Sequence, residues 1–239
     1  MTNSTSNPQK VRSGFFVFNA IAILAAILTL LPQSTHALEV KDGQRIVLLG
    51  NTLAERMQHH GWLEAYAQLS MPDKKLTFRN HGFCGDKIDS RPRNRGFIDP
   101  HKYLEISKAD VILTFFGANE AWDNNPSDYG TKLGKWVDDT LTKKYNGQSA
   151  PVIVLFSPIA HENLESPNFP DGKEQNEKLK KIAEVTAKVA KEKKLEYVDL
   201  FAASQNLYSK NKESLTMNGI HLTSDGNDHL ARVIHKALF

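Results

Sequence analysis

The sequence predicts an α/β fold, a three-layer α/β/α sandwich around a five-stranded parallel sheet. Three observations support this prediction. Short apolar runs alternate with longer amphipathic segments along residues 38–239. The run from Ala109 to Phe116 is apolar almost throughout, as in strands that are covered on both faces. With 239 residues, of which 40% are apolar and 24% charged, the chain can form one sizeable core.

Five short segments have the composition of strands. They are rich in apolar, β-branched and aromatic residues, and turn-forming residues bound them. Ala109 to Phe116 is the most apolar and is expected at the centre of the sheet. In chain order the predicted strands are Arg45 to Leu49, Leu76 to Asn80, Ala109 to Phe116, Pro151 to Phe156 and Leu195 to Asp199.

Four further segments have helical character. Lys173 to Lys194 is strongly amphipathic, and its lysines indicate a solvated face. The first helix is expected to run unbroken through Gly61 until Met71-Pro72-Asp73 ends it, and Ser90 to Pro100 predicts a surface loop. The predicted helices span about Leu53 to Leu69, Pro126 to Tyr145 and Lys173 to Lys194, with a last helix beginning near Thr223.

Residues 1–37 have the layout of a bacterial secretory signal. Lys10 and Arg12 precede an apolar run from Phe15 to Leu31, and Ala37 is the expected last residue before cleavage. The run of 17 residues just reaches spanning length, so an uncleaved anchor is the alternative. We therefore expect a single domain, residues 38–239, that is periplasmic or secreted. Membrane association is expected only if the segment stays attached.

Charge and cysteine content narrow the possible partners. Cleavage would remove two basic residues and no acidic ones, which leaves 28 basic against 27 acidic residues. No basic stripe with interleaved aromatic residues remains, so the sequence does not support a nucleic-acid partner. Cys84 is the only cysteine, which excludes an intramolecular disulfide. Without a C-x-x-C-H motif no haem is implied, and we expect a monomer that needs no cofactor.

Polar and glycine residues follow the predicted strands. Because the carboxyl ends of parallel strands meet at one edge of a sheet, these residues are expected to lie together. A helix start after Thr52 would favour a developing negative charge there. Taken alone, Thr52 is more readily interpreted as only the N-cap of that helix. The residues in question are Asn51, Thr52, Gly85, Asn119 and His161.

Four short blocks resemble those of the SGNH, or GDSL, hydrolases. They are G-N-T-L, N-H-G-F-C-G-D, G-A-N-E and N-G-I-H, and they span about residues 45 to 230 in the family's order. The resemblance implies the flavodoxin-like SGNH hydrolase fold and the hydrolysis of carboxylic esters. The G-N-T first block and the G-x-N-E third block resemble a subset of the family seen in planctomycete-type bacteria.

The resemblance also implies roles for single residues. Thr52 takes the place of the nucleophile, and His221 that of the general base. The backbone N–H groups of Thr52 and Gly85 and the side-chain amide of Asn119 would form the oxyanion hole. Further candidates for substrate contact at the same edge are Asn51, Glu120 and His161.

Two positions depart from the family's pattern. Thr52 replaces the usual Ser and brings a secondary alcohol that is restricted at χ1. Asn218 replaces the usual Asp and can orient His221 without adding charge; in a serine-protease triad the same change costs about 10⁴-fold in rate. The third member of the triad could therefore be missing, another carboxylate such as Asp225, or a backbone carbonyl.

Functions other than ester hydrolysis have less support in the sequence. The main alternative is an inactive SGNH-like module that binds acylated glycans. A flavodoxin-like nucleotide-binding protein lacks support, because no G-x-G-x-x-G or P-loop follows the first strand. His221, Asp225 and His229 are spaced like one helix face, but His221 precedes the helix, so we expect no metal site. O-acetyl groups on carbohydrates are the expected substrate by analogy with the family.

Overall fold

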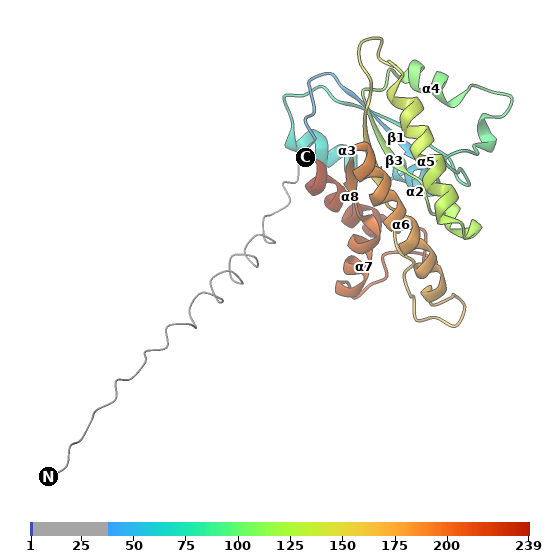
Figure 1. The fold of residues 1–239 in the computed structure, drawn as a ribbon, viewed down its shortest axis with the longest axis vertical. Helices are drawn as coiled ribbons and strands as arrows, with labels where there is room; N and C mark the ends of the chain where they lie inside the picture. The colour runs from blue at the N-terminus through green and yellow to red at the C-terminus, as the bar shows by residue number, and fades with distance from the viewer. Residues whose placement is uncertain (2–37) are drawn as a thin grey trace. The chain divides into compact units, whose positions relative to one another are not determined.

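The computed structural model describes Met1 and residues 38–239, so the predicted signal segment lies outside the described residues apart from Met1. Five parallel strands form one sheet in the order β2-β1-β3-β4-β5. Two of its strands, β1 and β3, are labelled in Figure 1. The predicted five-stranded parallel sheet is confirmed, with β3 at its centre. The strands are β1 (Arg45–Gly50), β2 (Thr77–Gly82), β3 (Val111–Phe115), β4 (Val152–Phe156) and β5 (Glu196–Val198).

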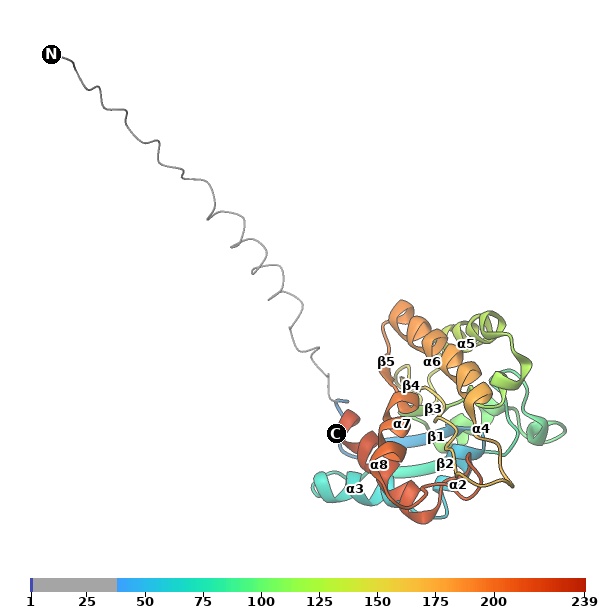
Figure 2. The same cartoon turned by 90° about the horizontal axis from the view of Figure 1, so that it is seen from below.

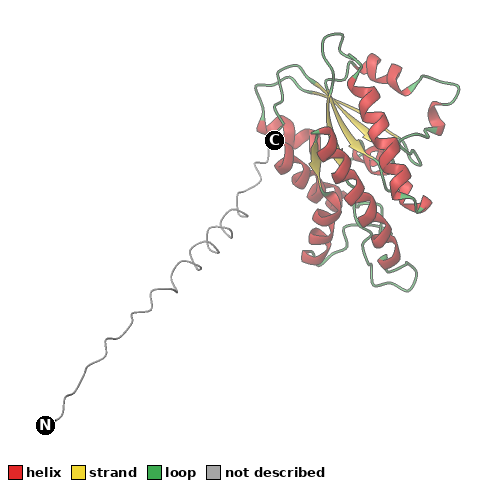
Figure 3. Ribbon diagram, viewed as in Figure 1, coloured by secondary structure: helices red, strands yellow, loops and turns green. Residues whose placement is uncertain are grey.

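Helices cover both faces of this sheet, so that red helices surround the yellow strands in Figure 3. One face carries α4 (Pro100–Ser107), α5 (Pro126–Leu141) and α6 (Lys173–Lys193). The other carries α2 (Thr52–Met57), α3 (Trp62–Ser70) and α8 (Ser224–Leu238). Figure 2 shows α5 and α6 on the opposite side of the strands from α3 and α8. The remaining helical segments are η1 (Pro92–Asn94), η2 (Glu120–Asp123) and α7 (Leu200–Lys210).

Alternate side chains of the strands build two cores. Val47 and Leu49 of β1 pack in the cluster that includes α4, α5 and α6. Ile46 and Leu48 of the same strand pack in the cluster that includes α2, α3 and α8. Because successive side chains of a strand point to opposite faces, a strand between two helical layers must be apolar at every position. This requirement accounts for the nearly continuous apolar runs of the sequence.

The first predicted helix is wrong in one respect, because it is two helices. α2 ends at Met57, and α3 begins at Trp62. Gly61 between them has a φ of 64°, in the left-handed region that glycine adopts at little cost. Gly61 is therefore a helix break and does not lie on an inner helix face.

One helix begins where the predicted surface loop ends. Pro100 is the first residue of α4, and the Asp99 side chain accepts hydrogen bonds from the backbone N–H groups of His101 and Lys102. A capping Asp followed by Pro is a helix-start signal, so the start of this helix could have been predicted. Among residues 38–239, none of the helices combines the length and the apolar character that crossing a membrane requires.

Candidate active site

A cavity of about 600 Å³ lies at the carboxyl edge of the sheet. Residues that follow β1, β3 and β4 line it, together with the segment that precedes α8. The predicted site residues among its lining are Asn51, Thr52, Asn119, His161, Asn218 and His221. The structure thus brings together side chains from four separate parts of the chain.

Asn51, rather than Thr52, caps the helix that follows β1. The Asn51 side-chain oxygen accepts a hydrogen bond of 3.2 Å from the backbone N–H of Leu53. Thr52 is the first residue of α2, and its hydroxyl makes no hydrogen bond with another described residue. The interpretation of Thr52 as the cap is therefore wrong, and its hydroxyl has no partner among the described residues. Buried Asn51 has a capping role besides its place in the cavity lining.

The turn that presents Thr52 is pressed against β3. A Cβ added to Gly50 would lie 2.4 Å from the backbone oxygen of Phe115, and the backbone N–H of Asn51 donates to that oxygen at 3.1 Å. Only glycine lets the two backbones come this close. The Gly of the G-N-T block thus fixes where Thr52 lies.

Asn218 orients His221. The Asn218 side-chain oxygen accepts hydrogen bonds from the His221 backbone N–H at 3.0 Å and from His221 Nδ1 at 3.1 Å. Because an amide oxygen can only accept, Nδ1 carries the proton and Nε2 keeps its lone pair. This is the tautomer that a general base needs. Asp225 lies in the first turn of α8 and makes no hydrogen bond with His221, so the neighbour of the ring is an uncharged amide.

The surroundings of His221 favour its neutral form. Burial lowers the pKa of His221, and the positive charge of Arg56 lowers it further. An unprotonated Nε2 at neutral pH is the state that can accept a proton from a hydroxyl.

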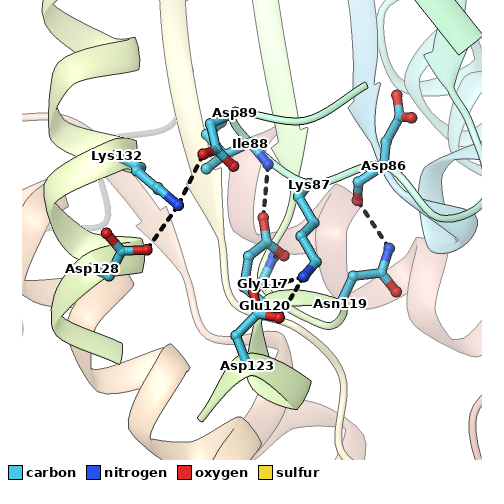
Figure 4. Close-up of polar contacts among 10 residues, drawn as sticks. All are labelled: Asp86, Lys87, Ile88, Asp89, Gly117, Asn119, Glu120, Asp123, Asp128 and Lys132. Atoms are coloured by element: carbon cyan, nitrogen blue, oxygen red, sulfur yellow. Dashed lines mark hydrogen bonds and ion pairs between the residues drawn. The ribbon is translucent and has the colours of Figure 1, made fainter. Parts of the chain in front are cut away.

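A hydrogen bond joins Asn119 to the loop that contains Gly85, and both residues are expected donors of the oxyanion hole. Asn119 Nδ2 donates a hydrogen bond of 2.9 Å to the backbone oxygen of Asp86, the residue after Gly85 (Figure 4). The second hydrogen of this amide remains for a ligand. Gly85 has a φ of 84°, is exposed, and does not line the cavity, so its place in the oxyanion hole stays a prediction.

Glu120 holds two loops and does not contact the cavity. Its carboxylate accepts hydrogen bonds from the backbone N–H groups of Ile88 at 2.7 Å and Gly117 at 2.9 Å (Figure 4). Burial raises the pKa of Glu120, and these N–H groups oppose that rise. Its side chain is 4% exposed and does not line the cavity. Glu120 therefore holds the two loops in position, in place of the contact with substrate that was expected of it.

Ion pairs add to this connection. Lys87 Nζ lies 2.5 Å from a carboxylate oxygen of Asp123. Lys132 of α5 bridges Asp89 at 2.9 Å and Asp128 at 2.8 Å (Figure 4). The loop after Gly85 is thus fixed to η2 and α5, the elements that follow Asn119. This network was not predicted, because its partners lie far apart along the chain.

A family model of the GDSL-like lipase/acylhydrolase family matches residues 48–229, which contain all four blocks. The chain belongs to this family. It is therefore an ester-bond hydrolase, and the predicted SGNH hydrolase fold is confirmed. Comparison with curated proteins finds no match.

Solved structures of GDSL-like and related hydrolases share the fold. A catalytic mutant of an acetylxylan esterase from Geobacillus stearothermophilus is 15% identical, with a TM-score of 0.64 over 84% of this chain and 96% of that chain. A lipase/acylhydrolase from Enterococcus faecalis is 21% identical, with a TM-score of 0.58 over 81% of this chain and 94% of that chain. At these identities the likeness shows the fold alone.

His161 lies in the wall of this hydrolase's cavity. Its side chain is 6% exposed, and Nδ1 donates to the backbone oxygen of Glu162 at 2.9 Å, so Nε2 is left as an acceptor. Gly172 and Gly219 pack against the ring, where an added Cβ would lie 2.4 Å and 2.2 Å from its atoms. The ring is held in one orientation, and the expected contact of His161 with a substrate stays a prediction.

Glu162 anchors the segment that leads to His221. Its carboxylate accepts hydrogen bonds from the backbone N–H groups of Leu215 at 3.0 Å and Thr216 at 2.7 Å, and from the Thr216 hydroxyl at 2.6 Å. Asn218 and His221 follow directly. The polar loop after β4 therefore contributes His161 to the cavity wall and, through Glu162, supports the segment that precedes His221.

Apolar side chains form the rim of the cavity. Trp122, Phe169 and Ile220 are exposed and line it. They were not predicted as site residues, since single exposed apolar residues between the predicted strands and helices form no recognisable pattern. Within residues 38–239, no group of three or more His, Cys, Asp or Glu side chains is placed to hold a metal.

Proposed function

We propose that this chain is an exported esterase that cleaves carboxylic esters by acyl transfer, with Thr52 as nucleophile and His221 as base. One observation carries the proposal. The Thr52 hydroxyl, which has no partner in the described part of the chain, and the His221 ring, whose Nε2 makes no hydrogen bond there, line the same cavity at the carboxyl edge of the sheet. The signal-like segment supports export, and membrane association would follow only from retention of that segment.

The reaction would proceed in two steps. Thr52 Oγ1 attacks the acyl carbonyl while His221 Nε2 takes the hydroxyl proton. The N–H groups of Thr52 and Gly85 and the amide of Asn119 stabilise the oxyanion, and removing one donor of this kind typically costs about 10²–10³ in rate. The alcohol leaves with the proton from His221. Water, activated by the same nitrogen, then releases the acid from acyl-Thr52.

Acylated carbohydrates are the proposed substrates, with O-acetyl groups as the acyl part. Two structural neighbours are acetylxylan esterases, the one from Geobacillus stearothermophilus and a second that is 18% identical, with a TM-score of 0.60 over 82% of this chain and all of that chain. Trp122 and Phe169 on the rim offer aromatic surface to a sugar ring. Its G-N-T first block supports the proposal that the chain belongs to the subset of the family seen in planctomycete-type bacteria.

Hydrolysis of 4-nitrophenyl esters from acetyl to octanoyl tests the mechanism. We expect the wild-type protein to favour short acyl chains and Thr52→Ala and His221→Ala to lose at least about 10³-fold in kcat. Thr52→Ser should be faster than wild type if the methyl group hinders attack. Wild type and all three variants being equally inactive across the series would contradict the proposal.

A binding module for acylated glycans is the second candidate, and uncharged Asn218 beside His221 favours it. Calorimetry with an acetylated xylo-oligosaccharide separates the two functions. Binding without any turnover would support the module. Turnover that is lost in Thr52→Ala supports the esterase.

A further inference from the structure

Arg56 is a cation in the cavity wall that no carboxylate of residues 38–239 neutralises. The other cations of the wall are paired, since Lys173 lies 3.1 Å from Asp171 and Lys178 lies 2.6 Å from Glu174. Arg56 makes no ion pair and no side-chain hydrogen bond with any described residue, and its Nε atom is buried without a partner. A buried donor of a charged group without a partner is costly, which indicates a ligand for it.

The acid next to Arg56 in sequence does not supply that partner. Glu55 Oε1 accepts a hydrogen bond from Gln58 Nε2 at 3.2 Å and lies 3.5 Å from His59 Nε2. The cavity-lining Asp171 and Glu174 are engaged by their lysines. The positive charge of Arg56 therefore acts on whatever occupies the cavity.

Arg56 lies close to both reacting groups. It follows Thr52 by four residues on α2, so the two side chains share one face of the helix with Cβ atoms about 5–6 Å apart. Its charge also acts on His221, whose pKa it lowers. A group bound by the guanidinium would consequently sit within one sugar unit of the ester.

We propose that Arg56 binds an anionic group of the substrate, a carboxylate or a sulfate carried near the ester, so that the preferred substrates are acylated acidic carbohydrates. This inference rests on the proposed esterase function and specifies its substrate class. A guanidinium presents a planar fork of N–H donors that pairs with carboxylate and sulfate oxygens in a bidentate way. Trp122 and Phe169 on the rim would hold the sugar ring that carries the anion.

The test compares kcat/KM on three acetylated methyl glycosides: the glycoside of glucose, which is neutral, the glycoside of glucuronate with its free carboxylate, and a glucose glycoside that carries a sulfate. We expect wild type to prefer an anionic ester about 10- to 100-fold, the range that charged hydrogen bonds give. Arg56→Gln should abolish this preference, mainly through KM. Arg56→Lys, which keeps the charge but loses the fork, should retain part of it. The anion with the larger preference identifies the group.

Arg95→Gln is the matched control, since Arg95 is an exposed arginine that does not line the cavity. It removes the same charge and should leave the preference unchanged. An anion preference that is equal in wild type and in folded Arg56→Gln, or no preference in wild type, overturns the inference while the esterase function stands.

Binding separates this inference from the proposed function. Calorimetry with the unacetylated methyl glycoside of glucuronate and the unacetylated sulfated glycoside on the Thr52→Ala protein should show binding that Arg56→Gln weakens at least tenfold. If no ester is hydrolysed by wild type but this Arg56-dependent binding is observed, the esterase fails and the anion site stands. If neither anion binds to Thr52→Ala, the anion site is overturned.

Discussion

Replacing Asn218 by Asp should raise the esterase rate. Asn218 Oδ1 accepts all three hydrogen bonds that its side chain makes with described residues, from the backbone N–H groups of Ile220 and His221 and from His221 Nδ1. Every donor is an N–H group, so a carboxylate of the same shape can accept the same bonds. The substitution adds one negative charge 3.1 Å from the imidazole.

The magnitude follows from the change in hydrogen-bond type. A neutral hydrogen bond contributes about 1 kcal/mol and a charge-assisted one about 1.5–3 kcal/mol, so the imidazolium form of His221 gains about 1–2 kcal/mol. Since one pKa unit corresponds to about 1.4 kcal/mol, the pKa of His221 should rise by about one unit. The gain in kcat should be at least about tenfold, and the cost of about 10⁴ for the reverse change in a serine protease is its upper limit.

The assay is the pH dependence of 4-nitrophenyl acetate hydrolysis. His221 must be neutral to act as base, so the rate falls as the pH drops below its pKa, and this acid limb should move up by about one pH unit in Asn218→Asp. Asn218→Ala loses the orienting oxygen and should be slower than wild type. An unchanged kcat together with an unmoved acid limb in Asn218→Asp would refute the reasoning.

Three further predictions concern stability. Glu120→Gln leaves one buried N–H donor unsatisfied and should cost about 1–3 kcal/mol in urea unfolding. Burial and the nearby arginines lower the pKa of His81 from 6.5 to about 4. As the pH falls from 6.5 to 4, the unfolded state therefore binds a proton at this residue before the folded state does. The free energy of unfolding should fall by about 3 kcal/mol over that range because of His81. His81→Gln should not show this loss, so the difference in free energy of unfolding between wild type and variant should change by about 3 kcal/mol from pH 6.5 to 4. A difference that stays constant over this pH range would contradict the prediction. Gly50→Ala would place a Cβ 2.4 Å from the backbone oxygen of Phe115 and should lower the melting temperature. Gly134→Ala on α5 is its control, because the added Cβ meets only a side chain at 3.8 Å. This variant should raise the free energy of unfolding by about 0.5–1 kcal/mol.

The elements of the fold that the sequence predicts well are those with a clear hydrophobic pattern. β1, β3 and β4 are apolar at consecutive positions because helices cover both faces, and short runs of this kind between turn residues are typical of buried parallel strands. Once the sheet is parallel, its carboxyl edge collects the residues that follow the strands, which places Thr52 and Asn119 in one cavity.

Features that depend on backbone conformation or distant contacts could not be predicted from the sequence. Gly61 in a helical stretch looks the same whether its φ is negative or, as here, positive. Asn51 and Thr52 are both good caps, and only the fold shows that Asn51 takes that role. The loop-holding role of Glu120 depends on Ile88, which lies 32 residues away, so no local pattern could reveal it.

The charges around His221 link the Asn218 substitution to the anion site at Arg56. In the natural chain the residue beside the imidazole is neutral, and the positive charge of Arg56 lowers the pKa of His221. An anionic substrate bound to Arg56 would offset that positive charge and so stabilise the imidazolium during reaction, as an Asp would. Asn218→Asp should therefore accelerate hydrolysis of the neutral acetylated glucoside more than that of the glucuronate, whose own negative charge the new carboxylate repels. Equal acceleration of both esters would show that the substrate anion has no influence on His221 and that the two effects are independent.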